Sequence, residues 1–294
     1  MKKQGLRIGS KRRARPLPYM LLVPMLLLLI TFSFFPFLRS VYLTFFVTDP
    51  LGHPGTYVGT RNWVRVFESD TFAQIMKATF HYAALVGVMT FFLAMFLAFL
   101  SADKRKYSRI YQTMFALPIA IASVPIASIA MYVFGRYGLL NGVLGTENIW
   151  LAQESTAIYF VAMTASWAHC GSSYIFLLVG FRNVPDELIE SAKLDGAGYI
   201  KRFFKIYCPI ASPQIFFVMF LNIVGAFKSF ALIRLLVQSG PNNSTNVLIY
   251  ALYSFGFSRG RFETACVYAL ILCFVIFVVT RIQLLLEKRM VHYQ

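Results

Sequence analysis

The acidic residues of this chain gather in one short segment, 184–198, where their types and spacing could support binding chemistry. Four of the 12 acidic residues lie there: Asp186, Glu187, Glu190 and Asp195. Long apolar runs of the kind that lipid buries flank the segment on both sides. Carboxylates placed this way, with no histidine or cysteine between them, suit a charged surface that another protein recognises. The segment is therefore a candidate docking helix.

The local sequence of the segment favours two short helices joined by a turn. Pro185 suits the first turn of a helix, because its missing N–H has no partner there anyway, and the acidic residues after it complement the helix dipole. Leu188, Ile189 and Ala192 form a narrow apolar stripe, and Gly196 allows the chain to turn. A second short helix through 203–207 then leads back to the apolar run that follows. The same features would also suit an ordinary amphipathic loop between two membrane spans.

Sequence signatures of catalysis are missing from the chain. It has no G-x-x-x-x-G-K-[ST] phosphate-binding loop and no H-E-x-x-H metal spacing, and its four histidines are scattered. We therefore expect no ATP hydrolysis by this chain itself, no cofactor and no metal site. A net charge of +16 at pH 7 is better explained by membrane topology than by nucleic-acid binding.

The composition predicts an all-α integral membrane protein. Hydrophobic residues make up 58% of the chain and charged residues 14%, which is too apolar for a soluble domain of this length. Charge-free runs approach or exceed the roughly 20 residues that a bilayer core requires. Six transmembrane helices are expected, at 19–38, 79–102, 110–135, 155–181, 206–227 and 264–280.

The distribution of Lys and Arg predicts the orientation. Most of the 28 basic residues lie in the N-terminal tail, the 103–109 loop, the 182–208 loop and the C-terminal segment. The positive-inside rule places these four regions, and so both termini, in the cytoplasm. The domain organisation expected is a basic cytoplasmic tail, 1–18, and one transmembrane domain, 19–294. The first apolar run is too long for a signal peptide and is expected to stay as a membrane span.

Polar residues around the end of the fifth expected span are candidates for a transport pathway. Asn222, Gly225 and Ser229 fall on one face of an ideal helix, and Lys228 lies beside them. A charge in hydrocarbon costs about 2.5–3.5 kcal/mol, so Lys228 is expected to face water or a partner chain. Arg234 would share that face only if the helix bends. Alternatively, Arg234 reaches the outer headgroups and the small residues only pack.

A motif across the docking segment carries a family resemblance. Glu190-Ser191-Ala192 matches an E-A-A triplet with one substitution, and Asp195-Gly196-Ala197 matches a D-G-A triplet. Phe203, Ile206 and Pro209 continue the same register. The chain resembles the permease subunits of binding-protein-dependent ABC importers, and among them the sugar and glycerol-3-phosphate uptake family.

That resemblance implies a type I importer permease fold, in which the loop 182–208 couples transport to separate ATPase subunits. It implies two ATPase subunits holding ATP and Mg, a second related permease, and an extracytoplasmic solute-binding protein. The location implied is a prokaryotic inner or plasma membrane, with solute import by alternating access. Lys228 and Ala231 depart from the residues expected there, which leaves the solute open. The coupling residues implied are Pro185, Glu187, Leu188, Glu190, Ser191, Ala192, Asp195, Gly196 and Ala197.

Two other classes of function stay open from the sequence alone. A secondary transporter or channel working by itself should carry acidic residues within its spans for ion coupling, and none lies in the expected spans. A membrane enzyme or receptor needs a nucleophile, an acid–base pair or a metal cluster, and the sequence shows none.

Overall fold

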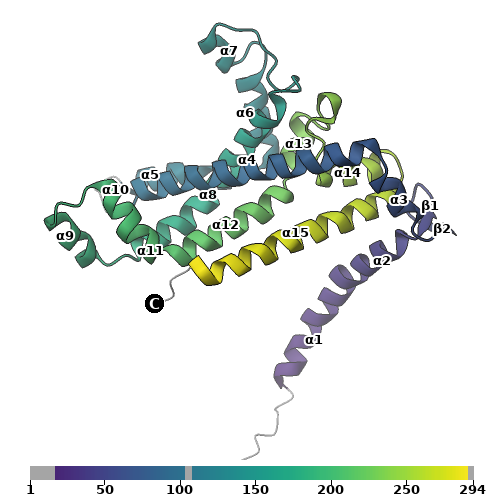
Figure 1. The fold of residues 1–294 in the computed structure, drawn as a ribbon, viewed down its shortest axis with the longest axis horizontal. Helices are drawn as coiled ribbons and strands as arrows, with labels where there is room; N and C mark the ends of the chain where they lie inside the picture. Colours follow the sequence, from purple (N-terminus) through teal and green to yellow (C-terminus); the bar gives the residue numbers. More distant parts are fainter. Residues whose placement is uncertain (1–16, 103–107, 291–294) are drawn as a thin grey trace, which may run out of the picture.

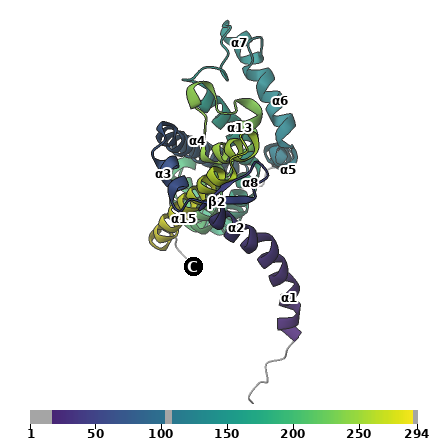
Figure 2. The same ribbon diagram turned by 90° about the vertical axis from the view of Figure 1, so that its right-hand side faces the viewer.

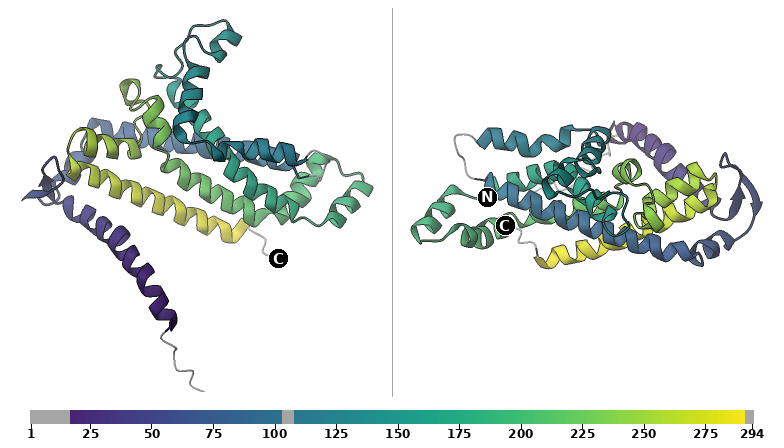
Figure 3. Two further views of the ribbon diagram at one scale, coloured as in Figure 1. Left: turned by 180° about the vertical axis from the view of Figure 1, so that it is seen from behind. Right: turned by 90° about the horizontal axis from the view of Figure 1, so that it is seen from above.

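The computed structural model describes residues 17–102 and 108–290. Four long helices lie side by side and form its central bundle (Figures 1 and 3). These helices are α4, α8, α12 and α15, with bounds Asp70–Leu100, Ala157–Arg182, Ser212–Phe227 and Phe262–Met290. The expected basic tail, 1–18, falls almost entirely outside the described residues.

Small residues let the bundle helices pack closely. Gly180 of α8 faces α12, and a Cβ added to it would lie 2.9 Å from Cβ of Gln214 and 3.3 Å from Cβ of Ala211. Glycine therefore allows the two backbones to approach, as is common between membrane helices. The core divides into two clusters along the bundle. One includes Val86 and Val267, and the other includes Tyr174 near the 184–198 segment.

A bent helical segment leads into α12. It consists of α10, η3 and α11, with bounds Tyr199–Arg202, Phe203–Tyr207 and Cys208–Ile210. The segment meets α12 at an angle of 80°. Pro209 and Pro213 stand at the starts of α11 and α12, where a missing N–H is tolerated. The run 206–227 is thus helical, but it is not one straight span.

The expected continuous span 110–135 is wrong in detail, because a break divides it. Helix α5, Ser108–Ala116, ends in the 3₁₀ turn η2, Leu117–Ala120, and α6, Ser123–Phe134, begins after an extended residue, Ile121. Pro118 in this turn donates no N–H, which disfavours a continuous helix. Helix α6 and the short α7, Leu139–Leu144, rise away from the bundle (Figures 1 and 2).

The first helical segment also leaves the bundle. It runs through α1, η1 and α2, with bounds Leu17–Leu29, Ile30–Phe34 and Phe35–Leu43. No residue from Met20 to Leu38 is buried, and α1 diverges from the other helices (Figure 1). So large an apolar surface requires lipid or protein cover.

A two-stranded antiparallel sheet corrects the all-α expectation. Strands β1, Phe46–Thr48, and β2, Pro54–Tyr57, pair after α2 and precede α3, Arg61–Phe67. The carboxylate of Asp49 accepts hydrogen bonds from the N–H groups of His53, at 2.8 Å, and Leu51, at 3.0 Å, and this closes the turn. These bonds, led by that from the His53 backbone, lower the pKa of Asp49.

The segment between α12 and α15 is folded from short pieces. The apolar stretch 247–257 is too short to span a membrane as one helix, and it folds as a short helix. The elements are α13, η4, α14 and η5, with bounds Ala231–Leu236, Pro241–Asn243, Leu248–Tyr253 and Ser254–Ser258.

By length and composition, four stretches of the described chain could cross a membrane, or five if the bent pair 199–227 counts as one crossing. The four are Met20–Leu43, Asp70–Leu100, Ser123–Leu144 and Phe262–Glu287. Helix α8 has 26 residues but is interrupted by polar side chains. The motif segment and the end of α15 lie at one end of the bundle, and the β-sheet lies at the other (Figure 1). The count of six spans stays a prediction.

Candidate functional site

The motif segment forms one exposed helix, α9, Asp186–Leu194, at an end of the bundle (Figure 1). Pro185 stands just before its first turn, in extended conformation, and Asp186 and Glu187 lie in the first turn. Lys193 lies in the last turn, so charges at both ends complement the helix dipole. None of the residues 186–194 is buried. The helix therefore presents most of its surface outward.

Gly196 ends α9 through a Schellman motif. Its φ of +71° lies in the left-handed region, which glycine adopts without strain. The N–H of Ala197 donates to the carbonyl of Ala192 at 2.9 Å, and the N–H of Gly196 donates to the carbonyl of Lys193 at 3.1 Å. These are the two bonds that define this helix end. The last residues of the two motif triplets, Ala192 and Ala197, are thus joined directly.

The apolar stripe expected on α9 is divided between two directions. Ile189 is half-buried and packs on the core cluster below. Leu188 is 47% exposed and is not among the side chains that pack on that core. Leu194, which the sequence reasoning did not single out, is 89% exposed. Two leucines on a charged helix offer a partner protein an apolar contact within a polar rim.

An aromatic cluster anchors the loop to the long helices. The ring of Phe99 on α4 lies 4.7 Å from that of Phe203 and 5.4 Å from that of Tyr207, between ring centroids. Phe181 on α8 completes the cluster, 6.0 Å from Phe203 and 5.8 Å from Tyr207. Edge-to-face rings in a packed core resist independent movement. The cluster therefore holds the loop against α4 and α8.

A small polar cavity lies between α4, α8 and α12. Asn222 is buried, and its Oδ1 accepts a hydrogen bond from Oγ of Ser173 at 2.7 Å. The Nδ2 of Asn222 and Oγ1 of Thr90 are buried without a partner among the described residues. The cavity has a volume of about 70 Å³ and is also lined by His169 and Gly225. Unpaired buried polar groups cost about 1–3 kcal/mol each unless water or a ligand satisfies them.

The structure separates the other residues expected with Asn222. Helix α12 ends at Phe227, so Ser229 is not on the same helix face; its hydroxyl pairs with that of Tyr82 at 2.9 Å. Lys228 is exposed just past the helix end. The guanidinium of Arg234, on α13, lies 4.1 Å from the ring centroid of Tyr253. Of the polar stripe expected on this helix, only Asn222 and Gly225 share a face, because α12 ends at Phe227.

Residues of α8 complete the cavity, and the sequence reasoning missed them. Ser172 and Ser173 follow His169 by three and four residues, so the three side chains line the cavity from one side of the helix. This spacing of polar residues inside an apolar run was the available signal. It also explains why α8, despite its 26 residues, is not among the stretches that could cross a membrane by length and composition.

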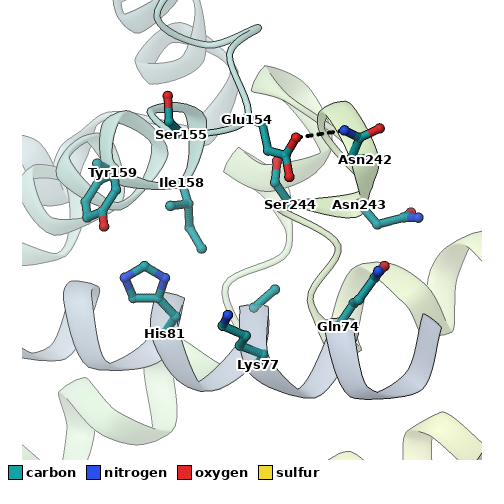
Figure 4. Close-up of a pocket in the computed structure, with 11 residues that line it drawn as sticks. Gln74, Lys77, His81, Glu154, Ser155, Ile158, Tyr159, Asn242, Asn243 and Ser244 are labelled. Atoms are coloured by element: carbon teal, nitrogen blue, oxygen red, sulfur yellow. Dashed lines mark hydrogen bonds between the residues drawn. The ribbon is translucent and has the colours of Figure 1, made fainter. Parts of the chain in front are cut away.

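A larger polar pocket, drawn in Figure 4, lies by the first turns of α4, at the end of the bundle opposite α9 (Figure 1). Its volume is about 660 Å³. It is lined by Gln74, Lys77, Ala78, His81, Glu154, Ser155, Ile158, Tyr159, Asn242, Asn243 and Ser244. The sequence reasoning did not group these residues, because three distant segments supply them.

Comparisons with known proteins agree on one family. The family model described as "Binding-protein-dependent transport system inner membrane component" matches residues 91–292. The chain is 30% identical, over 96% of its length and 97% of the relative's, to the "sn-glycerol-3-phosphate transport system permease protein UgpA" of Salmonella typhimurium. It is 31% identical to the protein of the same name from Pectobacterium atrosepticum, with the same coverage of both chains.

Solved structures share the fold. A chain of a bacterial ABC transporter involved in import of the acidic polysaccharide alginate matches with a TM-score of 0.82 and 21% identity, covering 94% of this chain and 96% of that one. A chain of the alginate transporter in complex with its alginate pentasaccharide-bound periplasmic protein matches with a TM-score of 0.83 and 21% identity, covering 93% of this chain and 94% of that one.

The family model covers well over half of the chain, and the relatives match along almost all of it. Apolar helices of spanning length agree with a place in a membrane. The chain therefore belongs to the inner membrane components of binding-protein-dependent transport systems, as a permease subunit of an ABC importer.

Proposed function

We propose that the chain passes a hydroxyl-rich solute (a sugar, an oligosaccharide or a glycerol-3-phosphate-like polyol phosphate) into the cytoplasm by alternating access. It would work with a second related permease, two ATPase subunits and an external solute-binding protein. Support comes from the UgpA relatives, which are named for transport of sn-glycerol-3-phosphate. Further support is the alginate transporter, whose structure includes a periplasmic protein.

The proposed topology has six crossings with both termini in the cytoplasm. The segments 17–43, 70–100, 108–144, 157–182, 199–227 and 262–290 would supply them. The distribution of Lys and Arg supports this orientation. Helix α8 would be a crossing despite its polar residues, because 26 residues extend about 39 Å and its polar side is covered by α4 and α12.

We propose that α9 is the coupling helix that an ATPase subunit grips. The observation that carries this role is an exposed, charged helix tied to a packed aromatic cluster. The Schellman end at Gly196 determines the direction of α9, and the contacts of Phe99 with Phe203 and Tyr207 connect it to α4. ATP and Mg would be held in the ATPase subunits, whose closure would move the loop and reopen the pathway outward.

The solute pathway proposed runs beside Asn222 and Gly225. Their cavity lies among three bundle helices and holds unpaired hydrogen-bonding groups suited to hydroxyl groups of a solute. Lys228, Ser229 and Arg234 would lie farther along, beyond the end of α12.

Reconstitution in liposomes tests the proposed function. The purified chain alone should show no ATPase activity, and solute-stimulated ATPase and uptake should appear once the second permease, the ATPase subunits and the binding protein are added. Uptake by this chain alone, driven by an ion gradient, would instead establish a secondary transporter. A ligand panel against the cognate binding protein, including sn-glycerol 3-phosphate and neutral disaccharides, would identify the solute.

A further inference from the structure

We propose that the pocket of about 660 Å³ at the end of the bundle opposite α9 is a second solute-binding site, distinct from the cavity at Asn222. The geometry points to a hydroxyl-rich solute that carries an anionic group. This inference rests on the proposed function, since it assumes that the chain transports a solute.

One wall of the pocket supplies a free positive charge. Lys77 and His81 lie one turn apart on α4, and both side chains line the pocket (Figure 4). Lys77 has no ion pair or hydrogen bond with any residue in the described part of the chain. An ammonium group offers three donors and attracts carboxylate or phosphate. The α4 wall therefore suits the anionic end of a solute.

The opposite wall supplies hydrogen-bonding groups for hydroxyls. Oε2 of Glu154 accepts from Nδ2 of Asn242 at 2.7 Å, and this bond links the segment before α8 to η4 (Figure 4). The other carboxylate oxygen of Glu154 can accept from a solute hydroxyl. Oγ of Ser244, which also lines the pocket, is buried without a partner among the described residues. A solute hydroxyl would satisfy it.

An aromatic pair lies on the α8 side of the pocket. The rings of His81 and Tyr159 meet edge to face, with centroids 5.4 Å apart and planes at 82°. Their apolar surfaces can pack against the C–H faces of a sugar or polyol. The pocket volume falls in the range of about 300–1,000 Å³ usual for small-molecule sites.

The pocket and the Asn222 cavity lie on the same two helices. Helix α4 supplies Lys77 to the first and Thr90 to the second, and α8 supplies Tyr159 and Ser173 in the same order. Fourteen residues of helix separate Tyr159 from Ser173, which corresponds to about 21 Å. A solute that enters the bundle at the end opposite α9 would thus meet the larger pocket first and the Asn222 cavity second.

Uptake by the complete complex tests this site. Lys77→Gln should raise the half-saturating concentration for an anionic probe, sn-glycerol 3-phosphate or an alginate trisaccharide, by about tenfold, the effect of one charge-assisted hydrogen bond. The matched control is Arg65→Gln, which removes an exposed cation of α3 outside the pocket and should change nothing. Co-purification of the subunits should be the same for both variants.

A labelling experiment reads the pocket directly. With His81→Cys in a chain whose own cysteines are replaced, the transported probe should slow labelling by a charged thiol reagent at least threefold. A cysteine that replaces Arg65 should label at the same rate with and without the probe.

The outcomes separate this site from the proposed function. If the wild-type complex transports a probe, but neither uptake by Lys77→Gln nor the labelling rate of His81→Cys changes, the site is overturned and the importer function stands. Equal loss of neutral disaccharide uptake in Lys77→Gln would overturn the charge assignment. If the wild-type complex imports no solute of the panel, the proposed function fails, and this site with it.

Discussion

The two ends of the bundle differ in how their candidate sites are built. At one end, α9 takes its form from neighbours in sequence: the bonds that end it join Ala192 to Ala197 and Lys193 to Gly196. At the other, the polar pocket joins α4 to the segment before α8 and to η4, and the Glu154–Asn242 bond crosses 88 residues of sequence. A local site can be read as a motif. A site assembled from distant segments cannot.

The largest effect is expected where local geometry controls α9. Gly196→Val places a β-branched residue at a φ of +71°, which costs about 1–3 kcal/mol, so the loop should turn elsewhere. ATPase subunits should no longer co-purify and uptake should be abolished, while membrane insertion persists. The control is Gly198→Ala, because Gly198 has a φ of −65° and nothing lies within 4 Å of an added Cβ. Normal association of Gly196→Val with the ATPase would contradict the coupling role of α9.

Reversal of one charge on α9 should act through binding without changing the fold. Glu190 is exposed, so Glu190→Lys should weaken co-purification of the ATPase about tenfold or more and reduce uptake equally. Glu68→Lys, an exposed acid at the opposite end of the bundle, is the matched control and should retain both. Equal losses in the two variants would show that the effect comes from the change in net charge and not from the position of Glu190 on α9.

Substitution of Asn222 should impair the solute pathway without impairing the binding of the ATPase subunit to the coupling loop. Asn222→Ala removes the 2.7 Å bond to Ser173 and leaves that hydroxyl buried, so solute-stimulated ATPase should fall about five- to tenfold. Co-purification of subunits should stay at the wild-type level, unlike that of Gly196→Val. Val224→Ala changes a half-buried residue of α12 outside the cavity lining and should have little effect. A loss of assembly in Asn222→Ala would assign the residue to packing alone.

The smallest effect is expected at Lys228. Its side chain is exposed beyond the end of α12, where a screened charge contributes about 0–1 kcal/mol. Lys228→Ala should lower uptake of an anionic solute at most about fivefold and leave uptake of a neutral solute and assembly unchanged. Uptake assays with both solutes check this. Unchanged values throughout would show that Lys228 takes no part in the pathway.

Sequence alone determined the membrane class, the family and the local form of α9. Long apolar runs require burial in lipid whatever the tertiary arrangement of the helices. The end of α9 depends only on residues within a few positions of Gly196. These signals need no knowledge of distant contacts. The motif triplets were therefore readable before their geometry was known.

Tertiary structure alone decided which polar groups meet in each site. Ser229 was expected on the face of Asn222, but α12 ends at Phe227 and Ser229 pairs with Tyr82, 147 residues away. Lys77 and Glu154 form no motif in the sequence. Lys77 lies on α4 and Glu154 in the segment before α8, and only the packing of the helices brings them to one pocket. Which polar groups meet depends on helix crossings, and those follow from close contacts such as that of Gly180 with Gln214.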